Sequence, residues 1–179
     1  MKRITFNILS LTAVLVLITS CSSNDPAGAY ADWKIKNNTY FTNYKDSTGY
    51  VLYTIPASSG GGSFYYKVSV AGDPNSVSPS VDEQVLVNYR GKMINGVVFD
   101  QTYQGKILQG DTTAAPRVFY TKQLIRGWIE NLKQMKKGEV RTIVLPQELG
   151  YGTVGVSHMI SPYSTTIWVV QLVSFNHVN

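Results

Sequence analysis

Residues 121–145 read TKQLIRGWIENLKQMKKGEVRTIVL, a stretch in which a helix pattern runs directly into a strand pattern. An apolar face at helical spacing is formed by Leu124, Ile125, Trp128, Ile129 and Leu132. Thr121 is expected to cap this helix, and Lys136-Lys137-Gly138 to close it with two basic residues and a stop glycine. The β-branched segment VRTIVL, residues 140–145, predicts a strand. The stretch therefore predicts one amphipathic helix beside a sheet.

Strand patterns surround this helix along the chain. Further strands are expected over residues 50–55, 64–70, 83–90, 97–100 and 166–175. The segment 64–70 predicts a half-buried strand, because one face carries Phe64, Tyr66, Val68 and Val70 and the other Lys67 and Ser69. In the segment 83–90, one side carries Val85, Val87 and Tyr89. Strands that return around a single amphipathic helix predict an α+β fold with an antiparallel sheet.

Two other segments carry weaker patterns. Residues 32–44 (DWKIKNNTYFTNY) have apolar and aromatic positions three or four apart, which predicts a short helix. Residues 102–116 contain two glycines, one proline and few apolar groups, which predicts an exposed loop. Loops of this length are uncommon inside compact domains and are often functional or disordered.

The composition excludes several classes of protein. With 179 residues, 44% hydrophobic and 12% aromatic, the chain has the material for one packed domain and a short extension rather than for a disordered tail. Its one cysteine excludes an intrachain disulfide and a Cys/His metal cluster. The two histidines, His158 and His177, stand alone, and no phosphate-binding loop or hydrolase motif is present. An enzyme with this sequence would therefore have to work without a nucleophile, a cofactor or a metal.

The first residues predict an export signal. Lys2 and Arg3 precede an apolar run over residues 8–18, and the sequence Ile18-Thr19-Ser20-Cys21 follows. This tetrapeptide resembles the bacterial lipobox, at which the signal is cut before a cysteine that then carries lipid. Lipidation of Cys21 is the resulting prediction. A plain secretory signal and a membrane span are the alternatives, although the polar residues leave the run short for a span.

Cleavage before Cys21 changes the charge of the chain. It removes two of the 16 Lys and Arg but none of the 11 Asp and Glu, so the formal net charge falls from +5 to +3. The basic excess then gives no reason to expect a nucleic-acid partner. The predicted organisation is a signal peptide (1–20), a flexible tether (21–31), an amino-terminal extension with a helix and a strand (32–63) and the main domain (64–179).

Six short segments occur in an order typical of one family. They are VLVNYRGK (85–92), GVVFD (96–100), QLIRGWIE (123–130), MKKGE (135–139), ELGYG (148–152) and ISP (160–162). The series resembles the FKBP family of peptidyl-prolyl cis-trans isomerases over about residues 64–175. The resemblance implies an antiparallel sheet wrapped around one short helix. The segment before it is similar to the amino-terminal extensions of lipoprotein members of the family.

The resemblance implies roles for individual residues. Trp128 would be the floor under a proline ring, Asp100 would accept or orient hydrogen bonds near the twisting carbonyl, and the Tyr151 hydroxyl would donate one. The walls of the substrate site would be Tyr89, Phe99, Phe119, Leu124, Ile125, Ile160 and Trp168. Ile125 also matches the position whose backbone amide receives a substrate carbonyl. Without the resemblance, aromatic and branched residues on strands would be read as core.

The sequence departs from the family pattern at three places. The acid at Asp100 is followed by a longer stretch, 101–116, that lacks the arginine expected to pair with it and offers only Lys106 before Arg117. Val156 stands where histidine is frequent, and Ser161 replaces the first proline of the common Ile-Pro-Pro. These changes put macrolide affinity and turnover in question more than the fold.

Two functions remain open at the level of sequence. The first is a lipid-anchored, cofactor-free prolyl isomerase of the bacterial cell envelope, facing the periplasm or the cell surface. Its partners would be proline-containing unfolded or nascent extracytoplasmic proteins, the membrane through lipid on Cys21, and macrolide ligands. The second is a chaperone or binding module that uses the same pocket with weak or no isomerase activity.

Overall fold

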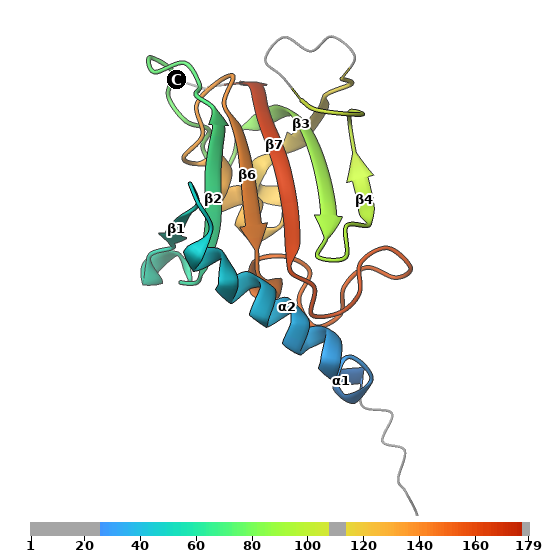
Figure 1. Cartoon of the computed structure of the whole chain (residues 1–179). Coiled ribbons are helices and arrows are strands. Elements are labelled where there is room, and N and C mark those ends of the chain that lie inside the picture. Colours follow the sequence, from blue (N-terminus) through green and yellow to red (C-terminus); the bar gives the residue numbers. More distant parts are fainter. Residues whose placement is uncertain (1–25, 108–113, 177–179) are drawn as a thin grey trace, which may run out of the picture.

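The computed structural model describes residues 26–107 and 114–176 and contains one antiparallel sheet (Figure 1). Its strands are β1 (Val51–Thr54), β2 (Ser63–Val70), β3 (Gln84–Met93), β4 (Val98–Gln101), β5 (Arg117–Tyr120), β6 (Val140–Leu145) and β7 (Thr166–Phe175). They are ordered β1-β2-β6-β7-β3-β4, and β5 also pairs with β3. This confirms the predicted α+β class with an antiparallel sheet.

Helices cover the two faces of the sheet. The α-helices are α1 (Pro26–Ala29), α2 (Ala31–Asn43) and α3 (Arg126–Leu132), and the 3₁₀ turns are η1 (Tyr44–Asp46), η2 (Ala57–Ser59), η3 (Thr121–Gln123) and η4 (Gln147–Leu149). The main core lies between the sheet and α3, where Trp128 and Leu132 pack. Helix α2 crosses the opposite face (Figure 1), where Phe41 packs against Tyr65.

The position of α2 corrects the expectation for residues 64–70. Phe64 is buried in the main core, but its neighbour Tyr65 is also buried, on the opposite face under α2. Val68, assigned to the buried face, is 43% exposed. Adjacent residues of a strand point to opposite faces, so a strand covered on both sides does not show simple alternation.

The central helix is shorter than its pattern predicts. Ile125 stands at the amino end of α3 without a side-chain cap, and the extended conformation of Leu124 separates η3 from α3. Thr121 is not the cap: its hydroxyl donates to the carbonyl of Glu83 at 2.8 Å. Lys136 does not lie in the last turn either, because α3 ends at Leu132. The Lys136 ammonium instead donates to the carbonyl of Ser76 at 2.7 Å.

The segment 102–116 is less exposed than predicted in its described part. Tyr103 and Ile107 are only 5% and 7% exposed and pack with Val140 of β6. Arg90 holds the same segment, since its guanidinium donates to the carbonyls of Tyr103 at 3.0 Å and of Gly105 at 2.8 Å. The expectation of an exposed loop is therefore wrong for Tyr103 and Ile107, whereas residues 104–106 and 115–116 are exposed, and 108–113 lie outside the described residues.

Two helices precede the first strand. Residues Pro26–Ala29, within the predicted tether, form α1, and α2 begins at Ala31. The predicted helix over 32–44 is confirmed by α2. None of the helices in the described part of the chain combines the length and apolar character needed to cross a bilayer. The predicted signal peptide and Cys21 lie outside the described residues.

A buried asparagine fastens α2 to the sheet domain. Asn37 is fully buried, and its side-chain oxygen accepts a hydrogen bond from the backbone N–H of Thr165 at 2.7 Å. Its amide nitrogen donates to the carbonyl of Trp33 at 2.8 Å, and the Thr165 hydroxyl donates to its carbonyl at 3.2 Å. These bonds connect α2 to the residue immediately before β7, so the extension packs as part of the domain.

Replacement of Asn37 by alanine tests this connection. The variant leaves the buried N–H of Thr165 without its partner, which costs about 1–3 kcal/mol of unfolding free energy. Urea unfolding followed by circular dichroism measures the loss. The matched control is Asn38→Ala on the exposed side of the same helix, which should change stability by less than about 0.5 kcal/mol. Equal stability of the two variants would contradict the proposed role of Asn37.

Candidate active site

A cavity of about 240 Å³ opens between α3 and the sheet. Trp128, the third residue of α3, is almost fully buried at this point and contacts two other rings nearly at right angles. The centroid of its ring lies 5.2 Å from that of Trp168 and 5.5 Å from that of Tyr89. The cavity is lined by Tyr89, Asp100, Phe119, Gln123, Leu124, Ile125, Trp128, Tyr151 and Trp168. It is therefore an aromatic hollow whose lining includes one charged residue.

Most residues predicted for the site line this cavity, and two do not. Phe99 packs against the cavity wall, with its ring centroid 4.9 Å from Trp168 and 6.3 Å from Tyr151. Ile160 is buried and lines a separate hollow of about 630 Å³ beside the β3–β4 connection. Gln123 lines the cavity although it was given no role. Its place directly before Leu124-Ile125 within the recognised segment was the signal that could have identified it.

The absence of a side chain at Gly91 makes room for the aromatic rings beside it. Gly91 of β3 stands opposite Trp168 of β7 in the register of the sheet. A Cβ atom at Gly91 would lie 2.4 Å from Cζ3 of Trp168 and 2.7 Å from Cε2 of Phe99. Both distances are far below van der Waals contact, so a side chain at this position would displace the rings. Glycine is required here for the Trp168 ring to lie over the strand.

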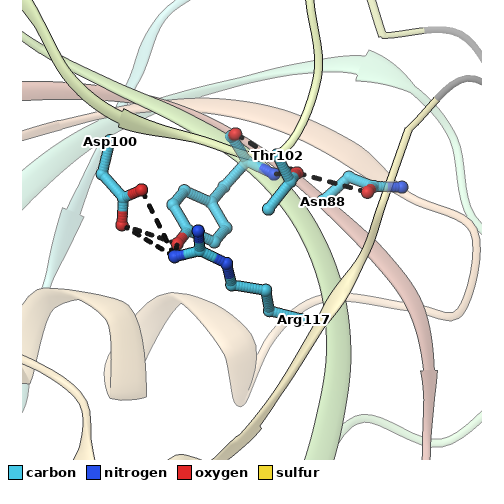
Figure 2. Close-up of polar contacts among 5 residues, drawn as sticks. Asn88, Asp100, Thr102 and Arg117 are labelled. Carbon is cyan, nitrogen blue, oxygen red and sulfur yellow. Dashed lines mark hydrogen bonds and ion pairs between the residues drawn. The ribbon is translucent and has the colours of Figure 1, made fainter.

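Polar groups meet at one side of the cavity (Figure 2). The Tyr89 hydroxyl donates to Oδ2 of Asp100 at 2.6 Å and accepts a hydrogen bond from Nη1 of Arg117 at 2.8 Å. The same Nη1 lies 3.4 Å from each carboxylate oxygen of Asp100. Burial, together with the neighbouring Asp100 carboxylate, raises the pKa of Tyr89 above its usual value. The hydroxyl therefore stays protonated and keeps donating to the acid.

The cation that pairs with Asp100 corrects an expectation from the sequence. The stretch after Asp100 was expected to lack the pairing arginine, yet Arg117 forms the ion pair. It reaches the acid because β4 and β5 both pair with β3, which places Asp100 opposite Gly91 and Arg117 opposite Val87. The long segment between the two residues in sequence does not separate them in space.

The backbone of Tyr89 is held from the other side. Its N–H donates to the hydroxyl oxygen of Thr102 at 2.9 Å, and the Thr102 hydroxyl donates to the side-chain oxygen of Asn88 at 3.2 Å (Figure 2). Asn88 in turn donates to Gln171 of β7 at 2.9 Å, in a buried pair. The start of the 102–107 segment therefore fixes the residue that carries the site's central hydroxyl.

Several donors at the cavity have no hydrogen-bond partner among the described residues, including the buried Nε1–H of Trp128. The Tyr151 hydroxyl makes none, and burial together with the nearby Asp100 raises its pKa to about 12. The backbone N–H of Ile125, at the amino end of α3, also donates to no described group. Among the described residues, no three His, Cys, Asp or Glu side chains lie close enough together to hold a metal ion. The cavity thus offers apolar walls and neutral donors on Tyr151, Ile125 and Trp128.

Comparison with known proteins matches the chain to one family. A family model described as FKBP-type peptidyl-prolyl cis-trans isomerase matches residues 75–173, more than half of the chain. The peptidyl-prolyl cis-trans isomerase Mip of Coxiella burnetii is 38% identical over 109 residues, which cover 61% of this chain and 43% of that protein. The outer membrane protein MIP of Legionella longbeachae is 30% identical over 141 residues, covering 79% and 53%.

Solved structures give the same result. The crystal structure of FkpA from Escherichia coli superposes with a TM-score of 0.67 at 32% identity, covering 84% of this chain and 62% of FkpA. The chain spans about half the length of the two curated relatives named above. The similarity therefore covers the segment that the family model matches and part of the sequence next to it.

The raised pKa of Tyr151 predicts how its contribution to stability varies with pH. The hydroxyl ionises near pH 10 in the unfolded chain and near 12 in the folded one. Its stabilising contribution is complete below pH 10 and is lost as the pH rises towards 12, because only the unfolded chain releases the proton in that interval. Urea unfolding should therefore show the wild type losing stability relative to Tyr151→Phe over this range. A constant difference between the two would contradict the assigned environment.

Proposed function

The chain belongs to the FKBP-type peptidyl-prolyl cis-trans isomerase family, and we propose that its cavity accelerates rotation about the bond before proline in bound polypeptides. The observation that carries the proposal is the aromatic hollow over Trp128, with Tyr151 and the Asp100–Arg117 pair at its side. The substrates we propose are proline-containing unfolded or nascent proteins outside the cytoplasm. No covalent step and no cofactor are needed.

The physical basis is the charge distribution of the amide. Resonance holds the X–Pro bond planar, with a barrier of about 18–20 kcal/mol, and spontaneous exchange takes roughly 10–100 s. A planar amide separates more charge than a twisted one, so moving it from water into an apolar site disfavours the planar ground state. A hollow walled by Tyr89, Phe119, Trp128 and Trp168 provides such a site.

The donors at the cavity suit the two carbonyls near the rotating bond. The Ile125 N–H lies at the end of a helix, where backbone donors point outward, and we propose that it receives a substrate carbonyl. The Tyr151 hydroxyl remains neutral up to about pH 12 and can donate to a second acceptor. Asp100 then orients hydrogen bonds beside the carbonyl that turns. A macrolide that occupies the same cavity would compete with the peptide.

We also propose a location for the protein. The sequence before the described residues carries the apolar run and the Ile18-Thr19-Ser20-Cys21 motif, which support export and lipidation at Cys21. The relative from Legionella longbeachae is named an outer membrane protein, which supports the cell envelope as the compartment. The ordered helices α1 and α2 would then lie between the lipid and the sheet domain.

An isomerase assay tests the proposed activity. The full chain should accelerate isomerisation of proline tetrapeptides and the refolding of a proline-limited protein, and Asp100→Ala and Trp128→Phe should each lower kcat/KM by about 10-fold or more. The matched control is Asp82→Ala, since Asp82 is an exposed acid whose ion pair with Lys122 lies outside the cavity. Folded wild type without any acceleration would overturn the proposal. Suppression of aggregation without acceleration would instead identify a binding module.

Lipidation is tested separately. Mass spectrometry of protein isolated from its native membranes should find an acylated Cys21 at the mature amino end. Replacement of Cys21 by serine should abolish this acylation. A mature chain with a free Cys21 thiol would refute lipidation while leaving the proposed activity untouched.

A further inference from the structure

Arg117 stands beside the cavity, and its side chain is more exposed to solvent than that of its ion-pair partner, Asp100. It is the first residue of β5, and its side chain is 55% exposed against 38% for Asp100. Its guanidinium carbon also lies 5.9 Å from the ring centroid of Tyr89. Arg117 therefore touches two residues of the cavity lining while facing outward.

Only one nitrogen of this guanidinium is engaged by the described residues. Nη1 donates to the Tyr89 hydroxyl and lies beside the Asp100 carboxylate, whereas Nε and Nη2 make no hydrogen bond within the described part of the chain. Figure 2 shows the Arg117 guanidinium next to Asp100. A guanidinium has five N–H donors in a fixed fork, and two parallel N–H groups bind a carboxylate bidentately. The Nε–Nη2 edge is such a pair, and the contacts of Nη1 with the described residues leave it unoccupied.

When Arg117 is counted with the lining residues, the charges at the cavity favour an anionic ligand more than the lining residues alone would. Asp100 is the one charged residue among the described residues that line the hollow, and alone it would repel an acidic polypeptide. Arg117 offsets that charge through the ion pair and presents its own donors on the more exposed side. The result is a neutral pair with a positive outer face.

We propose that Arg117 is a specificity-determining residue that makes the site prefer polypeptides with a glutamate or aspartate flanking the proline. The acidic side chain receives two hydrogen bonds from the Nε–Nη2 edge while the proline ring occupies the hollow over Trp128. This inference rests on the proposed function for its substrate class, but it concerns binding and can be measured without turnover.

The test compares tetrapeptides that differ only in charge. Peptides with Glu or Gln immediately before the proline, and a second set with these residues immediately after it, are measured with the full chain for kcat/KM and for binding followed by tryptophan fluorescence. In the wild type, one Glu peptide should be favoured over its Gln counterpart by about 2- to 5-fold, the range of a partly exposed ion pair. The preference should fall as salt rises from about 0.02 to about 0.5 M.

Variants assign the preference to Arg117. Arg117→Gln should bring the Glu:Gln ratio close to one, and Arg117→Lys, which keeps the charge but loses the fork, should reduce it. The matched control is Lys122→Gln, which removes one positive charge from an exposed residue paired with Asp82 and should leave the ratio unchanged. Because a ratio is compared, a general loss of activity in Arg117→Gln does not affect the conclusion.

Each result leads to a decision. Glu preference in binding without isomerisation would retain the role of Arg117 and refute the proposed activity. Isomerisation with equal use of Glu and Gln peptides at low salt would refute the role of Arg117 and retain the activity. A preference that persists in Arg117→Gln, or one that disappears in Lys122→Gln, would also overturn the inference. If Arg117→Gln does not fold, Arg117→Lys carries the comparison.

Discussion

The contact between the Trp168 ring and the backbone of β3 at Gly91 is the constraint on which both the core and the cavity depend. The strand register places these residues opposite one another, and the absence of a Cβ lets the indole lie directly over the strand. Trp128 of α3 then meets the edge of that ring, and Tyr89 closes the third side. The floor of the hollow is therefore positioned by the sheet and α3 rather than by loops, which gives it the rigidity of the core.

The same aromatic residues therefore serve stability and chemistry at once. Tyr89, Trp128 and Trp168 are buried members of the main core and also line the hollow. Replacing such a ring with a small side chain costs about 3–5 kcal/mol through lost burial and a residual cavity, a large share of the stability of a single domain. Variation in function is consequently easier at the side of the hollow, where Asp100 and Arg117 are partly exposed. The buried rings determine that an apolar ring such as that of proline is bound. The partly exposed Asp100 and Arg117 determine which residues next to that proline are favoured.

The sequence predicts the elements of this fold better than their contacts. The strands over 140–145 and 166–175 are found with those bounds, because each is rich in β-branched or aromatic residues and is followed by a proline or a polar residue. The burial of Tyr65 was missed, since it depends on α2 crossing from a distant part of the chain. Family resemblance identified most of the cavity lining, whereas periodicity alone gives no reason to separate Trp128 from ordinary core.

The ion pair shows why the length of a loop is a poor guide to the geometry at its ends. The segment between Asp100 and Arg117 is long, but loop-closure entropy grows slowly, by about 0.6 kcal/mol for each doubling of length. Its two ends are held independently of its length, because β4 and β5 both pair with β3 and the Tyr89 hydroxyl bonds to a residue of each. Arg90 and Thr102 also fix the first turn of the segment to β3. Insertions between these anchors can therefore change the surface beside the hollow while the acid, the hydroxyl and the guanidinium keep their places.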